Sequence, residues 1–298
     1  MLALPVVTGI AGFFPTACLF LLYWAFMTYT AFLLLELNLW LGDGVNLLTM
    51  AKRTLGWGGE IVAWITYLFL LYLLTTAYLA GGGPILLDLV HSVTGINFPS
   101  WMGALPLLIV FGFFIYKGTR YVDGVNRIMM IGLAVAYLTM MFWITPSISL
   151  ENLTHTEWHY GLISLSLIAT SFGYHIIIPT LTTYMHHNVK ELKRVILVGS
   201  LIPLLVYIIW EAMTLGVIPV EGKDGIIEGY QQGVNGIQLL TKHLKHSGVI
   251  RIAECFSFFA IVTSFLGVTH GGHPIFLRRV HSRTDASSLG GFYEIETQ

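Results

Sequence analysis

The stretch SFGYHIIIP, residues 171–179, lies at the centre of a segment, residues 158–189, that contains no Asp, Glu, Lys or Arg. A run of about 20 mostly apolar residues is long enough to cross the hydrocarbon core of a bilayer as a helix. Gly173 weakens a helix, and Pro179 has no N–H to donate to the carbonyl of His175. Broken helices are tolerated at that depth only inside protein or beside a cavity, and in transporters they form the substrate site. We therefore predict an unwound helix at a binding site within the membrane.

The composition is that of an integral membrane protein. Of the 298 residues, 55% are hydrophobic and 10% are charged, and the mean hydropathy is +0.75. The net charge of −1 gives no basic excess for binding nucleic acid. Cys18 and Cys255 both lie in apolar segments, so we expect neither a disulfide framework nor a cysteine-based metal site, and no cofactor. The first basic residue is Lys52, which argues against a cleaved signal peptide.

Charge-poor runs recur along the chain at spacings that suit a bundle of spanning helices. We predict an all-α integral membrane protein with about seven full spans, at residues 15–41, 61–87, 99–116, 128–144, 158–189, 194–219 and 250–270. Residues 1–8 are too short to span and have the pattern of the last part of a further helix. Leu47 to Leu55 predicts a short interfacial helix.

The positions of the basic residues predict how the spans are oriented. Positively charged residues are retained on the cytoplasmic side when they lie in short loops. One set of alternate loops carries Lys52, Arg53, Lys117, Arg120, Arg127, Lys190, Lys193, Arg194, Arg278, Arg279 and Arg283. The loops at residues 91–98 and 145–160 carry none, so the first full span runs from outside to inside. Lys223, Lys242, Lys245 and Arg251 lie on the other side, in or beside a connection of roughly 30 residues after Pro219. This connection is amphipathic enough for a surface helix and long enough to weaken the rule.

Broken helices in transporters come in pairs, one in each inverted repeat. Residues 1–5, MLALP, match residues 175–179, HIIIP, in pattern: one polarisable residue, three aliphatic residues and then proline. The two prolines are five predicted crossings apart, counting the first partial helix. The two segments therefore have opposite orientations, as inverted repeats require.

These features resemble the hydroxy and aromatic amino-acid permeases, which include the bacterial tyrosine and tryptophan permeases. The resemblance is carried, in collinear order, by residues 1–5, 33–36, 51–53, 55–56, 72–78, 122–123, 126–127, 170–175 with Pro179, and 259–267. It implies a five-plus-five inverted-repeat transporter fold in the bacterial inner membrane. It also implies proton-driven import of aromatic amino acids. We predict that tyrosine is favoured over tryptophan.

Two departures from the family pattern lead us to expect an incomplete permease. In the family, a cytoplasmic start and a glycine-rich unwound stretch precede the position of Met1, and this sequence lacks both. After Gly267 the resemblance ends, and residues 278–298 are polar where further helices are expected. We therefore divide the chain into a permease domain, residues 1–270, and a divergent polar tail, residues 271–298.

The substrate site is predicted at the broken segment. Ser171, Gly173 and His175 offer hydroxyl, backbone and imidazole groups there, and aromatic side chains can line a pocket for a ring-bearing substrate. The aromatic candidates are Phe172, Tyr174, Tyr78, Phe256 and Phe259. His175 is the candidate proton carrier, because imidazole titrates near physiological pH. The alternatives are a neutral histidine bonded to a neighbouring carbonyl, and aromatic residues that face lipid or the core.

Other motifs favour structural roles. Glu36 and Glu211 lie within spans, where a structural hydrogen bond is favoured over a proton relay. His186 and His187 with Glu191 lack the order of a zinc-protease motif, so no metal site is predicted. Residues 81–83, three consecutive glycines in a span, predict close packing or bending.

The function that we predict is secondary active transport of aromatic amino acids, with the substrate, the proton and the lipid bilayer as partners. One alternative is a non-functional truncated permease. Another is a membrane-embedded enzyme that uses the histidines and Glu211. No paired-Asp, nucleophile-elbow or His-Glu-x-x-His motif supports an enzyme.

Overall fold

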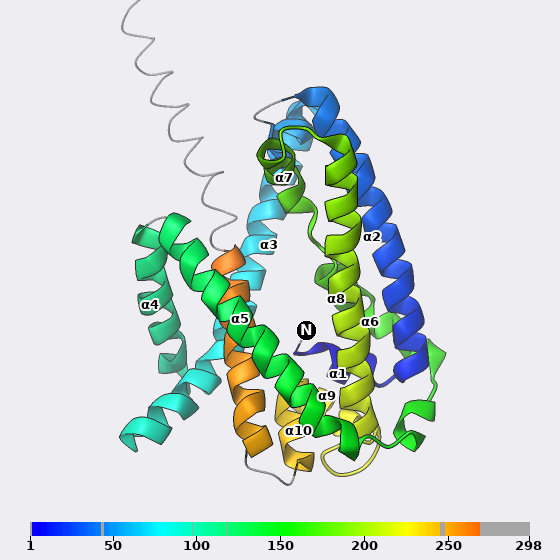
Figure 1. The fold of residues 1–298 in the computed structure, drawn as a ribbon, viewed down its shortest axis with the longest axis vertical. Coiled ribbons are helices and arrows are strands. Elements are labelled where there is room, and N and C mark those ends of the chain that lie inside the picture. The colour runs from blue at the N-terminus through cyan, green and yellow to red at the C-terminus, as the bar shows by residue number, and fades with distance from the viewer. Residues whose placement is uncertain (1, 43–44, 97, 118, 245–247, 269–298) are drawn as a thin grey trace, which may run out of the picture. The chain divides into compact units, whose positions relative to one another are not determined.

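The structure, a computed structural model, describes residues 2–42, 45–96, 98–117, 119–244 and 248–268 (Figure 1). Every regular element within these ranges is helical, as the sequence predicts. The α-helices are α1 (Leu4–Thr8), α2 (Phe13–Leu41), α3 (Leu47–Thr94), α4 (Ala104–Lys117), α5 (Thr119–Ile144), α6 (Gly161–Ser171), α7 (Ile178–Tyr184), α8 (Val189–Val217), α9 (Ile226–Gln232), α10 (Gly236–His243) and a last helix, Gly248–Val268. The predicted polar tail, residues 271–298, lies outside the described residues.

Six helical segments among the described residues are long and apolar enough to cross a membrane. They are Phe13–Leu41, Leu47–Leu87, Val122–Ser147, Trp158–Tyr184, Val189–Val217 and Gly248–Val268. The seventh predicted span, residues 99–116, is not among them. There a 3-10 turn, Ser100–Gly103, precedes α4, which has only 14 residues. About 20 residues of helix are needed to cross the hydrocarbon core.

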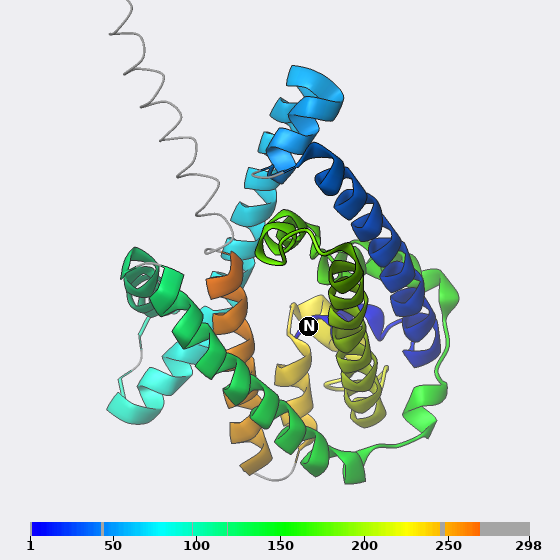
Figure 2. The ribbon, with the colours of Figure 1, turned by 45° about the horizontal axis from the view of Figure 1, so that its top comes forward.

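The chain forms two compact units. The first comprises residues 1–54 and 131–257, and the second comprises residues 55–130 and 258–298. In the first unit α2 packs against α8, α6 and α7, while α1 packs against α6, α8 and α9 (Figure 2). Phe20 early in α2 shares a core cluster with Leu204 late in α8, whereas Leu35 late in α2 meets Leu192 early in α8. The helices α2 and α8 therefore run antiparallel.

Many large apolar side chains of α2 and α8 remain exposed on the protein surface. On α2 they include Leu21, Leu22, Phe26 and Leu33, and on α8 they include Leu197, Val198, Ile202 and Leu205. In water such contiguous exposure marks an interaction surface, and in a spanning helix lipid tails cover it. The outward faces of the first unit are therefore those of a membrane protein.

Two glycines mark helix boundaries: Gly12 precedes α2, and Gly56 lies at a kink in α3. Gly12 precedes α2 with a φ of 92°, and a Cβ there would lie 2.0 Å from the carbonyl oxygen of His155. Gly56 interrupts α3 with a φ of 72° and a ψ of −163°. L-residues with side chains rarely adopt such angles. The kink at Gly56 ends the short helix that the sequence predicts over Leu47 to Leu55.

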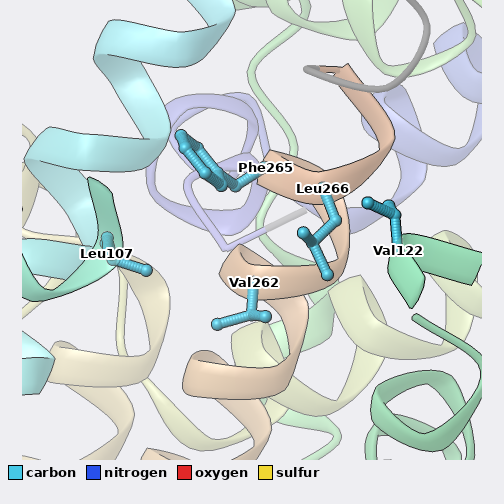
Figure 3. Close-up of a cluster of buried hydrophobic side chains, with 5 residues drawn as sticks. All are labelled: Leu107, Val122, Val262, Phe265 and Leu266. Atoms are coloured by element: carbon cyan, nitrogen blue, oxygen red, sulfur yellow. The ribbon is translucent and has the colours of Figure 1, made fainter. Parts of the chain in front are cut away.

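The second unit is held together by close packing around α3, α4 and the last helix. A Cβ on Gly103 would lie 2.4 Å from the carbonyl oxygen of Gly83, so the two backbones touch. Beside this contact, a buried cluster joins Leu107, Val122, Val262, Phe265 and Leu266 (Figure 3). The close packing predicted for the three glycines, residues 81–83, is confirmed.

The connection between α8 and the last helix folds as two short helices, α9 and α10, rather than the single surface helix that the sequence favours. Gly233 ends α9 in the left-handed conformation, and Asn235 begins α10 with a capping box to Gln238. This connection packs on α1, because the Gly236 N–H donates to the carbonyl oxygen of Leu2 at 2.9 Å. The first residues of the chain therefore belong to the core of the first unit.

Candidate functional site

The predicted break is present in the structure. The helix α6 ends at Ser171, residues 172–174 are not helical, a 3-10 turn covers His175–Ile177, and α7 begins at Ile178. Pro179 lies in the first turn of α7, where a missing N–H does no harm. Pro5 occupies the same place in α1. Proline therefore lies in the first turn of each of these short helices rather than bending the middle of a longer one.

Gly173 is needed at the break for space rather than for a left-handed backbone. A Cβ at this position would lie 3.1 Å from the carbonyl oxygen of Thr170, which is tighter than ordinary van der Waals contact. The Gly173 N–H donates to that same carbonyl at 3.2 Å. The chain therefore turns back tightly on the last turn of α6.

Phe172 anchors the break in the core of the first unit. Its side chain is 2% exposed and packs with Leu4, Phe20 and Ile168. Edge-to-face contacts join its ring to Phe20 at 6.2 Å and to Tyr207 at 5.5 Å between centroids. In this conformation the predicted pocket residue Phe172 contacts protein aromatic rings.

A polar network from α2 and α8 meets the residues that follow Phe172. The Tyr174 hydroxyl donates to Thr28 Oγ1 at 3.3 Å. Thr28 Oγ1 lies 3.3 Å from Ser200 Oγ, which also accepts a hydrogen bond from the Trp24 indole N–H at 3.1 Å. Thr28 and Ser200 are buried. The network therefore places neutral hydrogen-bonding groups inside the predicted membrane region.

His175 contacts a hydroxyl group of α2. Its Nε2 lies 2.8 Å from Thr30 Oγ1. Its ring also stacks on that of Tyr174, with centroids 5.4 Å apart. His175 is half-buried. Its role as a proton carrier stays a prediction.

The carbonyl oxygen and the hydroxyl group of Ser171 have different hydrogen-bond partners. Its carbonyl oxygen accepts a hydrogen bond from the Tyr207 hydroxyl at 3.3 Å, and its own hydroxyl donates to the carbonyl of Leu167 at 2.8 Å. A helix that ends early leaves its last carbonyls without helical donors. Tyr207 supplies one such donor from α8.

The remaining predicted site residues are Phe256, Tyr78 and Phe259. Phe256 is 1% exposed and packs between Trp210 and Tyr137, with ring centroids 5.5 Å and 5.8 Å away. Tyr78 and Phe259 belong to the second unit, where Tyr78 packs against the cluster of Figure 3 and Phe259 lies beside Phe258. The structure groups residues 171–175 and leaves Phe256 outside that group.

Sequence reasoning missed the partners that α2 and α8 bring to the break. They are Trp24, Thr28, Thr30, Ser200 and Tyr207. A signal for them existed, because Trp24 and Thr28 are four residues apart and therefore share a helical face, as do Ser200 and Tyr207, seven apart. Polar residues that share a face in an apolar span are the pattern to search for.

The sequence also singles out two glutamates and two histidines, which lie outside residues 171–175. Glu211 is 1% exposed and forms a hydrogen bond with Thr8. Glu36 is exposed. His186 and His187 have φ angles of 49° and 59° and form the turn between α7 and α8. Backbone N–H groups of this turn donate to Thr183 and Thr182 at the end of α7.

Comparison with known proteins identifies the family. The model of the tryptophan/tyrosine permease family matches residues 1–281, so the match extends beyond Gly267, where the motifs end. The chain is 35% identical to tyrosine-specific transport system 1 of Haemophilus influenzae, over 91% of this chain and 67% of that protein. It is 32% identical to tyrosine-specific transport system 2 of the same organism, over 91% and 68%. It is 31% identical to a tryptophan-specific transport protein of Pseudomonas aeruginosa, over 91% and 66%.

No solved structure matches this fold. The chain spans about two thirds of the length of these relatives, all of which are named as transport proteins rather than enzymes. The matched residues include the short helices α1 and α7 and the whole polar network around the break. The chain is therefore a multi-pass membrane protein and a member of the tryptophan/tyrosine permease family.

Proposed function

We propose that the protein imports aromatic amino acids by secondary active transport across the bacterial inner membrane, that it favours tyrosine over tryptophan, and that protons drive it. The observation that carries the proposal is the break at residues 172–174 together with the hydroxyl groups of Thr28 and Ser200. In transporters, unwound backbone at this depth is where substrate groups replace the missing helical hydrogen bonds.

Support for tyrosine comes from the chemistry of the network. The tyrosine phenol both donates and accepts a hydrogen bond, whereas the tryptophan indole only donates. Hydroxyl groups such as those of Thr28, Thr30 and Ser200 can satisfy both roles. A site built to bond a substrate hydroxyl strongly rejects an analogue without one, because its buried polar groups are left unpaired. The two tyrosine-specific relatives, 35% and 32% identical, agree with this preference.

The test is uptake of labelled tyrosine into proteoliposomes that contain the purified protein. We expect an acidic outer solution to drive uptake, a protonophore to abolish it, and replacement of sodium by choline to leave it unchanged. Unlabelled tyrosine should compete better than tryptophan, and phenylalanine worse than both. Uptake that follows sodium would refute proton coupling, and stronger competition by tryptophan would refute the tyrosine preference.

A further inference from the structure

Glu211 is a buried acid that lies outside the polar network at the break. Among the residues whose side chains the structure describes, it is the only buried Asp, Glu, Lys or Arg. It lies in the last third of α8 and meets α1 through Thr8. Its Oε2 atom is buried and has no hydrogen-bond partner among the described residues. A buried, unpaired charge is unfavourable, so the question is whether this carboxyl group is protonated.

Counting hydrogens around Thr8 indicates that state. Thr8 Oγ1 lies 2.6 Å from the carbonyl oxygen of Leu4, and a carbonyl can only accept, so the single hydroxyl hydrogen of Thr8 points there. The same Oγ1 is also hydrogen-bonded to Glu211 Oε1. An ionised carboxylate has no hydrogen to donate. Both bonds can exist together only if Glu211 carries a proton and donates it to Thr8.

The ionised state of Glu211 would disturb α1. Thr8 would have to turn its hydrogen from Leu4 to the carboxylate, and Oε2 would still lack a partner. A buried charge without partners is strongly unfavourable. Ionisation therefore requires either that water reaches the carboxyl group or that α1 moves away from α8. Protonation and the position of α1 are thus linked.

The elements that surround Glu211 carry other titratable side chains, several of which are exposed or have partners of their own. The elements that pack against α1 and α8 are α2, α6, α9, α10 and the 3-10 turns at residues 145–147 and 151–154. Their titratable side chains are Cys18, Tyr23, Tyr29, Glu36, Glu151, Glu228, Tyr230, Lys242 and His243, and His155 directly follows the second turn. Glu36, Glu151 and Tyr230 are exposed, Lys242 and His243 bond to Asp224, and His155 Nε2 contacts the carbonyl of Ile10. Thr8 is the partner that the described residues provide for Glu211.

We propose that Glu211 binds the coupling proton and holds it while α1 lies against α8, and that it releases the proton when the two separate. This inference rests on the proposed proton-driven transport. In the first step, the carboxylate takes a proton from outer water and an O–H bond forms at Oε1. In the second, α1 moves, that bond breaks, and the proton passes to inner water. Glu211 then takes the role for which the sequence suggests His175.

Infrared spectroscopy tests the protonation directly and does not depend on transport. At neutral pH the purified protein should show the carbonyl stretching band of a protonated carboxylic acid. Glu211→Gln should remove the band, Glu36→Gln should keep it, and Thr8→Val should shift it, because the acid loses its hydrogen-bond partner. A spectrum without the band in the parent protein, or with the band intact in Glu211→Gln, would overturn the proposal.

Transport assays test the coupling. Glu211→Gln, which resembles the protonated acid, should exchange labelled tyrosine across the bilayer within about twofold of the parent rate. A pH difference of one unit should drive about tenfold tyrosine accumulation in the parent protein and in Glu36→Gln, if one proton moves with each substrate, and none in Glu211→Gln. Accumulation that survives in Glu211→Gln would overturn this proposal alone. No pH-driven accumulation in the parent would overturn the proposed proton coupling as well.

Discussion

Ser200, like Thr28, joins two other side chains of the polar network. Its Oγ accepts from the Trp24 indole at 3.1 Å and lies 3.3 Å from Thr28 Oγ1. Ser200→Ala leaves these two groups without that partner in an apolar setting. We expect a loss of about 1–2 kcal/mol in the free energy of unfolding.

The measurement is unfolding of the purified protein in one detergent. Thr66→Ala serves as the control, because the Thr66 hydroxyl is exposed and bonds to the carbonyl of Val62 in its own helix. That change should alter stability by less than about 0.5 kcal/mol. Equal losses in the two variants would show that the network contributes nothing specific.

At the scale of the element, the break in the helix depends on close approach at Gly173. Gly173→Ala places a Cβ 3.1 Å from the carbonyl oxygen of Thr170, so the backbone of the turn must shift by a few tenths of an ångström. We expect a loss of about 1 kcal/mol in the free energy of unfolding. Gly199→Ala is the matched comparison, because Gly199 lies in α8 with open space around its Cβ position. Alanine there should stabilise by about 0.5–1 kcal/mol. Stabilisation by both changes in thermal unfolding would contradict the role of Gly173.

The connection with α9 and α10 is held by an ion pair that responds to pH. Lys242 Nζ lies 2.5 Å from Asp224 Oδ1, and this hydrogen bond holds the pKa of the Asp224 carboxyl below its ordinary value. A carboxyl with a lowered pKa stabilises the fold above its unfolded pKa, near 4, and loses that contribution as the pH falls through its folded pKa. Amide exchange in residues 226–243, corrected for the intrinsic rate, should therefore accelerate below a pH of about 4.

Two variants separate this ion pair from general acid effects. Asp224→Asn should remove the acid-dependent step and show the faster exchange at all pH values. Glu221→Gln should keep the step, because Glu221 is an exposed acid of the same connection. A step of unchanged size in Asp224→Asn would show that another group is responsible.

At the scale of the whole molecule, the fold of the first unit predicts which end faces the cytoplasm. The helices α2 and α8 run antiparallel, so the end of α2 and the start of α8 lie at the same end of the unit. Arg53 donates to the carbonyl of Leu41 at 2.9 Å, where the α2 dipole is negative, and Lys190 lies in the first turn of α8. The loop at residues 145–157 meets the other end of α8, through Gly216.

Cysteine labelling of intact cells measures this orientation. In a background with Cys18→Ala and Cys255→Ala, a membrane-impermeant reagent added outside should label Thr156→Cys and not Lys190→Cys. Permeabilised cells should label both. Labelling of Lys190→Cys from outside would reverse the topology that the basic residues predict.

Several features of this protein could be predicted from sequence, because they depend on local properties. The length of an apolar run determines whether it can span a bilayer, and glycine and proline favour a helix boundary, as at Gly173 and Pro179. The kink at Gly56 is local as well, because glycine readily adopts the positive φ found there. The difference at residues 99–116 has a local cause as well: apolarity does not determine how much of a run is α-helix, and a 3-10 turn occupies its beginning.

Only the tertiary structure decided which polar groups meet the break and where the buried acid lies. Thr30 contacts His175 across 145 positions in the sequence, Trp24 contacts Ser200 across 176, and Thr8 meets Glu211 across 203. No local preference of these residues specifies such pairs. They form because α1, α2 and α8 bury apolar faces against one another, and a polar group carried into that interior is stable only where it finds a partner.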